Sequence, residues 1–229
     1  MKTNKNFYSV VLALAIVIFV LIVVSSTASA ATLNVGSTAK YKTIQSAVNA
    51  AKDGDTIKVA YGTYNENVKI DKQLFILGTK YPKVDGFYYY GGSAGTINGF
   101  SIKKYGINAA YDGGYPTIIR NNYFYNCGIS LIGLFMNDAI IMNNQIIGGT
   151  IFLNDNHGQT ITGNTISKSK IGLYMGEMGA NPTVSKNTFK NCNTAVYVYS
   201  DSNPGQLKTF SNNKYINNKV NIGWGTKYL

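Results

Sequence analysis

Charged residues are scarce in this chain of 229 residues, because Asp, Glu, Lys and Arg together make up only 14%, against about 25% in a typical soluble domain. This scarcity argues against a charged helical bundle and against a disordered acidic or basic tail. Arg120 is the only arginine, and the lysines that bring the net charge to +11 are scattered rather than clustered. The surface is therefore weakly basic without the basic stripe of a nucleic-acid-binding protein, and we expect no nucleic-acid partner.

The N-terminal segment has the layout of an export signal. Two lysines precede the apolar run 10–24, and the small-x-small pattern Ala28-Ser29-Ala30 follows. This order predicts a signal peptide over residues 1–30 that is cleaved after Ala30. The alternative is an uncleaved membrane anchor, since residues 7–24 are just long enough to span a bilayer. In both cases residues 31–229 are expected to be extracellular, at the cell surface or in a periplasm, and a membrane is a partner only if the segment is kept.

A repeat of roughly 22 residues fills the second part of the chain, from residue 96 to residue 229. We take as its anchor Phe100 in the first unit and an asparagine in each of the others, at Asn122, Asn144, Asn164, Asn187 and Asn213. Apolar residues recur three positions before the anchor, at Ile97, Ile119, Ile141, Ile161, Val184 and Phe210. They recur two positions after it, at Ile102, Phe124, Ile146, Ile166, Phe189 and Tyr215. A third column lies seven positions after the anchor, at Ile107, Ile129, Ile151, Ile171, Thr194 and Val220. A fourth column lies nine positions after it, at Ala109, Leu131, Leu153, Leu173, Val196 and Ile222.

These columns predict an all-β solenoid. The last two columns are two residues apart, which is the side-chain period of a strand, and many of their members are β-branched. A unit of this length cannot bury its own apolar face, so it must stack on its neighbours. We predict that the anchor asparagines occupy left-handed turns and that their amides hydrogen-bond from coil to coil. A leucine-rich repeat has a similar period but a leucine consensus that is missing here, so a right-handed parallel β-helix fits better.

Residues 31–95 are expected to form an N-terminal cap and the first coils of the same continuous domain, 31–229. Thr43 is placed to cap a short helix in which Ile44, Ala47, Val48 and Ala51 share one face. Strand-like segments follow at 56–59, 68–70 and 74–77. A helix laid over the first coil would cover an apolar end and a sheet edge.

The stretch YKTIQSAVNAAKDGDTIKVAYGTYNENVKIDKQLFILG resembles the opening segment of the pectin-lyase-like right-handed β-helix superfamily. The units after it resemble the asparagine-bearing repeats of carbohydrate-processing and surface proteins. The resemblance implies the fold more strongly than the function. It leaves open polysaccharide lyases, glycoside hydrolases, pectin esterases, adhesin-like surface proteins and periplasmic copper-handling proteins.

The two cysteines occupy the same position of the repeat, since Cys127 and Cys192 each follow their anchor by five residues. They lie three coils apart, which is about 14 Å when neighbouring strands are about 4.8 Å apart. A disulfide allows a Cα separation of at most about 7 Å. We therefore predict two free thiols that pack as small apolar side chains.

One set of carboxylates could form a catalytic site. Asp138, Asp155 and Glu177 come from adjacent coils and lie at similar distances after their anchors. A glycosidase needs a pair of carboxylates at one sugar, and a lyase needs a calcium site with a basic residue that accepts the proton. The alternative is that each carboxylate belongs to an ordinary solvated loop.

A second set of residues could bind a metal. Met136, His157 and Met178 fall on consecutive coils in nearly the same column. Thioether and imidazole ligands favour copper(I), which is consistent with the copper-handling relatives that the resemblance implies. The alternative is ordinary packing of methionine beside a loop histidine. No cofactor is required by the sequence, and calcium or copper are its two candidate ions.

Aromatic residues recur down the coils and could bind a ligand, at Phe87, Tyr88, Tyr89, Tyr90, Tyr111, Tyr115, Tyr123, Tyr125, Tyr174, Tyr197 and Tyr199. Rings on a flat face beside amides suit pyranose rings, and Tyr174, Tyr197 and Tyr199 are the predicted ligand-binding residues. The alternative is that tyrosine simply favours strands.

The sequence therefore favours an exported binding or structural module, adhesin-like, whose partner is a polysaccharide or another component of the cell envelope. A polysaccharide lyase or glycoside hydrolase is the first alternative, and a periplasmic copper-binding protein is the second. The last strand-like segment also leaves an edge that could pair with a second copy of the chain.

Overall fold

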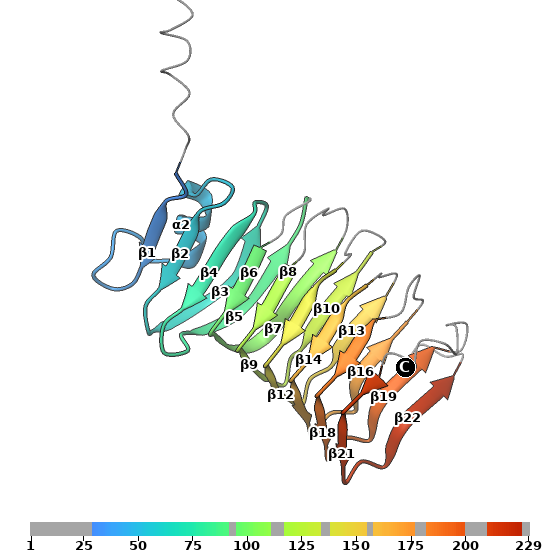
Figure 1. Ribbon diagram of the computed structural model, residues 1–229. Coiled ribbons are helices and arrows are strands. Elements are labelled where there is room, and N and C mark those ends of the chain that lie inside the picture. The colour runs from blue at the N-terminus through green and yellow to red at the C-terminus, as the bar shows by residue number, and fades with distance from the viewer. Residues whose placement is uncertain are drawn as a thin grey trace, which may run out of the picture. The chain divides into compact units, whose positions relative to one another are not determined.

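The computed structural model describes residues 29–91, 95–110, 117–133, 138–154, 158–176, 182–199 and 210–225. The chain divides into two compact units, Met1–Ala30 and Ala31–Leu229. The second unit is a solenoid of stacked strands with one short helix after its first strand (Figure 1). Among the described residues, no helix has the length and apolar character needed to cross a membrane.

The helix α2, Ile44–Ala50, begins where the sequence predicts it. Thr43 is extended and its hydroxyl accepts a hydrogen bond from the backbone N–H of Ser46, which satisfies a donor that the first helical turn leaves free. Ile44, Ala47 and Val48 are buried against the first strands. The predicted capping helix is thus confirmed.

Two parallel sheets make up the solenoid. In the described residues the first sheet contains nine strands: β1 (Thr32–Val35), β2 (Thr56–Val59), β4 (Leu74–Gly78), β6 (Gly95–Asn98), β8 (Thr117–Arg120), β11 (Ile140–Met142), β14 (Thr160–Thr162), β17 (Thr183–Ser185) and β20 (Phe210–Ser211). All of its strand pairs are parallel, which is the arrangement predicted for a β-helix.

The second sheet bends around the other sides of each coil. It starts with three long strands, β3 (Thr63–Ile70), β5 (Lys83–Tyr89) and β7 (Ser101–Ala110). After β7 each coil contributes two short strands to this sheet instead of one long strand. One row contains β9 (Tyr123–Tyr125), β12 (Gln145–Ile147), β15 (Thr165–Ser167), β18 (Thr188–Lys190) and β21 (Lys214–Ile216). The other row contains β10 (Ile129–Ile132), β13 (Ile151–Asn154), β16 (Ile171–Met175), β19 (Thr194–Tyr199) and β22 (Val220–Gly225).

Two predicted apolar columns are confirmed residue by residue. The column three residues before the anchor pairs in register from Ile97 to Phe210, and the column two residues after it pairs from Ile102 to Tyr215. Their members are buried in all but the last coil, where Phe210 and Tyr215 are only partly covered. Because inward residues alternate with outward ones, one stacked core runs the length of the solenoid.

The other two predicted columns are wrong at one step. Ile151 pairs with Leu173, and not with Ile171, while Leu153 pairs with Met175. In the third unit Ile151 follows Ile141 by 10 residues, whereas in the fourth unit Leu173 follows Ile161 by 12 residues. The strand of the fourth unit is therefore shifted by two residues. A shift of two keeps each side chain on its own face, so the core stays apolar. Ile171 packs instead with Tyr174 and Tyr197, in a small cluster separate from the main core.

The anchor asparagines form a buried ladder but do not occupy the left-handed turns predicted for them. The residue before each anchor has the positive φ, at Gly99, Asn121, Asn143, Gly163, Lys186 and Asn212. The anchors Asn122, Asn144, Asn164 and Asn187 are at most 1% exposed. The Oδ1 of Asn144 accepts from the backbone N–H of Asn122 at 3.0 Å, and the Nδ2 of Asn144 donates to Ile119 O at 2.9 Å. Each anchor thus satisfies backbone groups of the coil before it.

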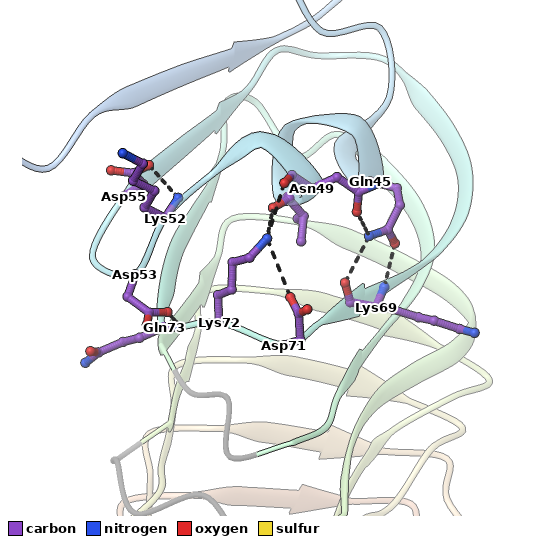
Figure 2. A network of polar contacts seen from close by, with 10 residues as sticks. Gln45, Asn49, Lys52, Asp53, Asp55, Lys69, Asp71, Lys72 and Gln73 are labelled. Carbon is purple, nitrogen blue, oxygen red and sulfur yellow. Dashed lines mark hydrogen bonds and ion pairs between the residues drawn. The ribbon is translucent and has the colours of Figure 1, made fainter.

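The first coil is closed by polar side chains from helix α2. The side-chain amide of Gln45 donates to Lys69 O at 3.1 Å and accepts from Lys69 N at 2.8 Å, as Figure 2 shows. It therefore satisfies the edge of β3 as a neighbouring strand would. The Nζ of Lys72 donates to Val48 O and Asn49 O at the end of the helix, where a positive charge is favourable.

Candidate functional site

Most carboxylates that the structure describes have structural roles at the cap. Glu66 accepts hydrogen bonds from the backbone N–H groups of Ile44 and Gln45 at the start of α2. Asp53 accepts from the N–H of Gln73, and Asp71 forms an ion pair with Lys72 (Figure 2). These groups are occupied by stabilising contacts, so they are poor candidates for catalysis.

Asp55 is the carboxylate that the cap holds most firmly. It is 6% exposed and accepts hydrogen bonds from the N–H groups of Lys52 at 2.8 Å and Ala31 at 2.7 Å. These bonds lower the pKa of Asp55 below its ordinary value of 3.8. Its stabilising effect is therefore complete above pH 3.8 and is lost as the pH falls through the lower pKa of the folded protein.

We expect Asp55→Asn to reduce the free energy of unfolding at pH 7 by about 1–2 kcal/mol, because two charge-assisted hydrogen bonds are weakened. The variant should also lose less stability than the wild type between pH 4 and pH 2, as measured by urea unfolding at several values of pH. Asp71→Asn is the control, because its ion pair with Lys72 is exposed and is worth at most about 1 kcal/mol. Equal pH profiles for the wild type and Asp55→Asn would contradict this assignment.

The predicted catalytic carboxylates are only partly described. Asp138 lies in an exposed turn with a φ of 60°, and its Oδ1 is close to the Cα of Gly158 on the next coil. Asp155 and Glu177 lie outside the described residues. A catalytic role for these three residues stays a prediction.

The predicted metal ligands Met136, His157 and Met178 also lie outside the described residues. Within the part of the chain that the structure describes, no group of three His, Cys, Asp or Glu residues could hold a metal ion. Cys127 and Cys192 are both free, as the column argument predicts. Burial raises the pKa of the Cys127 thiol, and its Sγ donates to Ile102 O.

Two of the three predicted ligand-binding tyrosines are largely covered. Tyr174 and Tyr197 are 2% and 8% exposed, while Tyr199 is partly exposed. The ring of Tyr174 stacks between Phe152 at 4.6 Å and Tyr197 at 5.5 Å. Phe152 and Tyr174 also line a hollow of about 150 Å³. Stacking along the solenoid thus uses most of the ring surface that a sugar would need, and ligand binding by these tyrosines stays a prediction.

A larger hollow lies on the second sheet, and we call it the lysine–tyrosine groove. It has a volume of about 530 Å³ and is lined by Lys83, Ser101, Lys103, Tyr125 and Asn126. Ser101 pairs with Lys83 on one side and with Tyr123 on the other. The small serine between two long side chains leaves the space. Tyr125 is 42% exposed at its border.

A bulge in β7 forms one wall of this groove. Between the paired positions Val84–Ile102 and Gly86–Gly106, β5 has one residue and β7 has three. The three residues Lys103, Lys104 and Tyr105 are therefore pushed outward, and all are exposed. The bulge brings Lys103 to the same hollow as Lys83 and leaves Lys104 exposed beside it.

Aromatic rings border the groove and its lysines. The rings of Tyr81 and Tyr123 meet edge to face at 4.7 Å. The Nζ of Lys104 lies 4.8 Å from the ring centre of Tyr105. A hydrogen bond with the Tyr105 side chain raises the pKa of Lys104, and the nearby carboxylate of Asp85 raises it further. None of the described residues that line the groove is a carboxylate.

The sequence pointed to Tyr123 and Tyr125 as surface aromatics but not to the lysines beside them. One feature of the sequence does indicate the bulge that brings Lys103 to the groove. Ile102 and Gly106 enclose the polar run Lys103-Lys104-Tyr105, which interrupts the alternation of a strand. Whether this run forms a bulge depends on how many residues of β5 lie opposite it, and the sequence of β7 alone does not contain that number.

The family model described as "Right handed beta helix region" matches residues 44–228. Comparison with curated proteins and with solved structures gave no significant match. The matched range covers the helix, every strand except β1 and every described residue that lines the lysine–tyrosine groove.

Proposed function

We propose, from the premise that this chain belongs to the right-handed β-helix family, that it is a binding module for an acidic polysaccharide. This fold often binds or acts on polysaccharides. The observation that carries the proposal is the lysine–tyrosine groove, in which Lys83 and Lys103 face one hollow with Tyr125. Ammonium groups attract carboxylates, and a tyrosine ring offers a flat apolar face for a sugar ring.

Two features favour binding over catalysis. The described residues that line the groove offer cations, a hydroxyl and an amide, but no carboxylate to act as acid or base. The hollow also lies on paired parallel strands, so binding there need not order a loop of the backbone. Asp138, the described member of the predicted catalytic set, is not among the described residues that line the groove.

We also propose that the module is exported and acts at the cell surface, in an adhesin-like role. The support is the order of lysines, apolar run and small residues before Ala31, the residue at which the compact solenoid unit begins. Self-association is a further proposal. In the described residues β22 ends the second sheet, and Val220 and Trp224 on it are 43% and 44% exposed.

We expect the double variant Lys83→Ala with Lys103→Ala to bind polygalacturonate about tenfold more weakly than the wild type. Each exposed ion pair is worth at most about 1 kcal/mol, and about 1.4 kcal/mol corresponds to a factor of ten. Isothermal titration calorimetry at fixed ionic strength measures this change. The affinity of the wild type should also fall as salt is added, because both lysines are exposed.

Lys190→Ala with Lys214→Ala is the matched control, because both lysines are exposed on β18 and β21 of the same sheet and the variant also removes two positive charges outside the groove. It should change the affinity less than twofold. Equal binding of an uncharged dextran, or an equal loss in the control, would contradict the proposed ligand. New reducing ends or unsaturated products would contradict the proposed lack of catalysis.

A further inference from the structure

A second hollow, which we call the cap pocket, shares no described lining residue with the lysine–tyrosine groove. Three successive strands of the first sheet end there, since residues 36–39 follow β1, residues 60–61 follow β2 and residues 79–80 follow β4. Its volume is about 430 Å³. It lies in the cap and first coils, and the proposed function makes no use of it.

The polar side chains of the cap pocket can all donate hydrogen bonds, although its hydroxyls and the amide of Asn34 can also accept them. Lys58 and Lys80 contribute ammonium groups from two different strands, and Ser37 and Thr38 contribute hydroxyls from the loop after β1. Tyr61 is 67% exposed at the border and adds a phenol. No described residue of the lining is a carboxylate.

The cap separates its charges along the strands of the first sheet. Asp53 and Asp55 lie before β2, whereas Lys58 lies near its end and Lys80 lies just after the end of β4. Three residues of an extended strand span about 10 Å, so the carboxylate of Asp55 is far from the ammonium group of Lys58. Lys42 adds a third cation, with its Nζ 2.7 Å from Ser37 O. An anion at the pocket therefore meets net positive charge.

The wall of the pocket is fixed before any ligand binds. Gly36 N donates to Tyr41 O at 3.0 Å, and Ala39 N donates to Gly36 O at 3.2 Å. On the other side Lys80 and Tyr81 both have a left-handed backbone, with φ of 58° and 57°. Such angles are costly for residues other than glycine and often occur at binding sites. Here they turn the chain between the cap pocket and the Tyr81–Tyr123 contact.

We infer that the cap pocket binds a phosphate group, either of inorganic phosphate or of a phosphate monoester. A phosphate carries a charge of about −1.5 to −2 and offers three or four acceptor oxygens in different directions. Donors that line one hollow from three strand ends suit oxygens that point in different directions, whereas the two oxygens of a planar carboxylate would meet fewer of them. The volume exceeds that of phosphate alone, so an ester has room for its organic part.

The test is calorimetric titration of the full chain with inorganic phosphate, glycerol 3-phosphate and acetate at one ionic strength. We expect saturable one-to-one binding of phosphate and at least tenfold weaker binding of acetate. The double variant Lys58→Gln with Lys80→Gln should lose at least tenfold in phosphate affinity. Both side chains are exposed, so far-UV circular dichroism should show an unchanged fold.

Lys190→Gln is the control for a general loss of charge and should change phosphate affinity less than twofold. The groove variant Lys83→Ala with Lys103→Ala should also bind phosphate normally, so failure of the proposed function is distinguishable from failure of this inference. Binding of glycerol 3-phosphate identifies an ester as the occupant, and binding of inorganic phosphate alone identifies the free ion. No saturable binding, equal binding of acetate, or an equal loss in Lys190→Gln would overturn the inference.

Discussion

Asn164→Ala is expected to lower the free energy of unfolding by about 3–5 kcal/mol, because it breaks the asparagine ladder at its centre and leaves buried polar groups without partners. The Oδ1 of Asn164 accepts from Asn144 N at 2.9 Å, and its Nδ2 donates to Ile141 O at 2.9 Å. Each buried group left unsatisfied costs about 1–3 kcal/mol. Urea unfolding followed by circular dichroism measures the change.

Asn108→Ala is the matched control for this prediction. The amide of Asn108 faces solvent on β7 and donates one hydrogen bond, to Tyr105 O, so its loss should cost less than about 0.5 kcal/mol. Asn164→Asp tests whether the fold is stabilised by the hydrogen-bond donors of the Asn164 side chain or by its volume. It keeps the size of the side chain but loses the donor to Ile141 O and buries a charge, so it should be at least as unstable as Asn164→Ala at pH 7. A small effect of both variants would show that the ladder does not stabilise the fold.

The ladder shows how far the sequence determines this solenoid. A repeated asparagine indicates a constrained position in each coil, but two interpretations are possible: a left-handed turn, or a buried amide that hydrogen-bonds to the backbone. The structure assigns them to adjacent residues, since Asn143 has a φ of 54° and Asn144 is buried. Asparagine suits both roles, so a run such as Asn121-Asn122 or Asn143-Asn144 does not say which member turns the chain.

The core could be predicted where the strand is short and the turn before it has a fixed length. Ile141 and Ile146 are five residues apart, as are Ile119 and Phe124, so both columns stay in register through every unit. The face that contains Ile171 follows a turn of variable length. Its register is chosen by packing between coils, and the sequence of one coil does not contain that information.

The lysine–tyrosine groove was harder to predict for the same reason. It depends on three residues of β7 opposing one residue of β5, and on Ser101 lying between Lys83 and Tyr123. Both relations join different coils. A column of similar residues in the repeats indicates which residues of neighbouring coils are paired. Lys83, Ser101 and Tyr123 are unlike one another, so the sequence gives no such indication for the groove.

Gly106→Ala is the second substitution with a large expected effect, about 2–5 kcal/mol of lost stability, because two costs combine at one residue. Gly106 has a φ of 74°, which costs a residue with a Cβ about 1–2 kcal/mol. A Cβ there would also collide with the carbonyl oxygen of Gly128 on the next coil, and backbone cannot move aside as a side chain can. Overpacking of this kind costs about 1–3 kcal/mol more.

Two further glycines separate these costs. Gly54 has a φ of 85° with nothing within 4 Å of an added Cβ, so Gly54→Ala should show the backbone cost alone. Gly128 has no positive φ, but its Cβ would collide with Thr150 O, so Gly128→Ala should show the contact cost alone. The loss measured for Gly106→Ala should approach the sum of the two. If Gly106→Ala were no worse than Gly54→Ala, the coils would not be packed backbone to backbone at this corner, and the bulge that carries Lys103 to the groove would lack its rigid base.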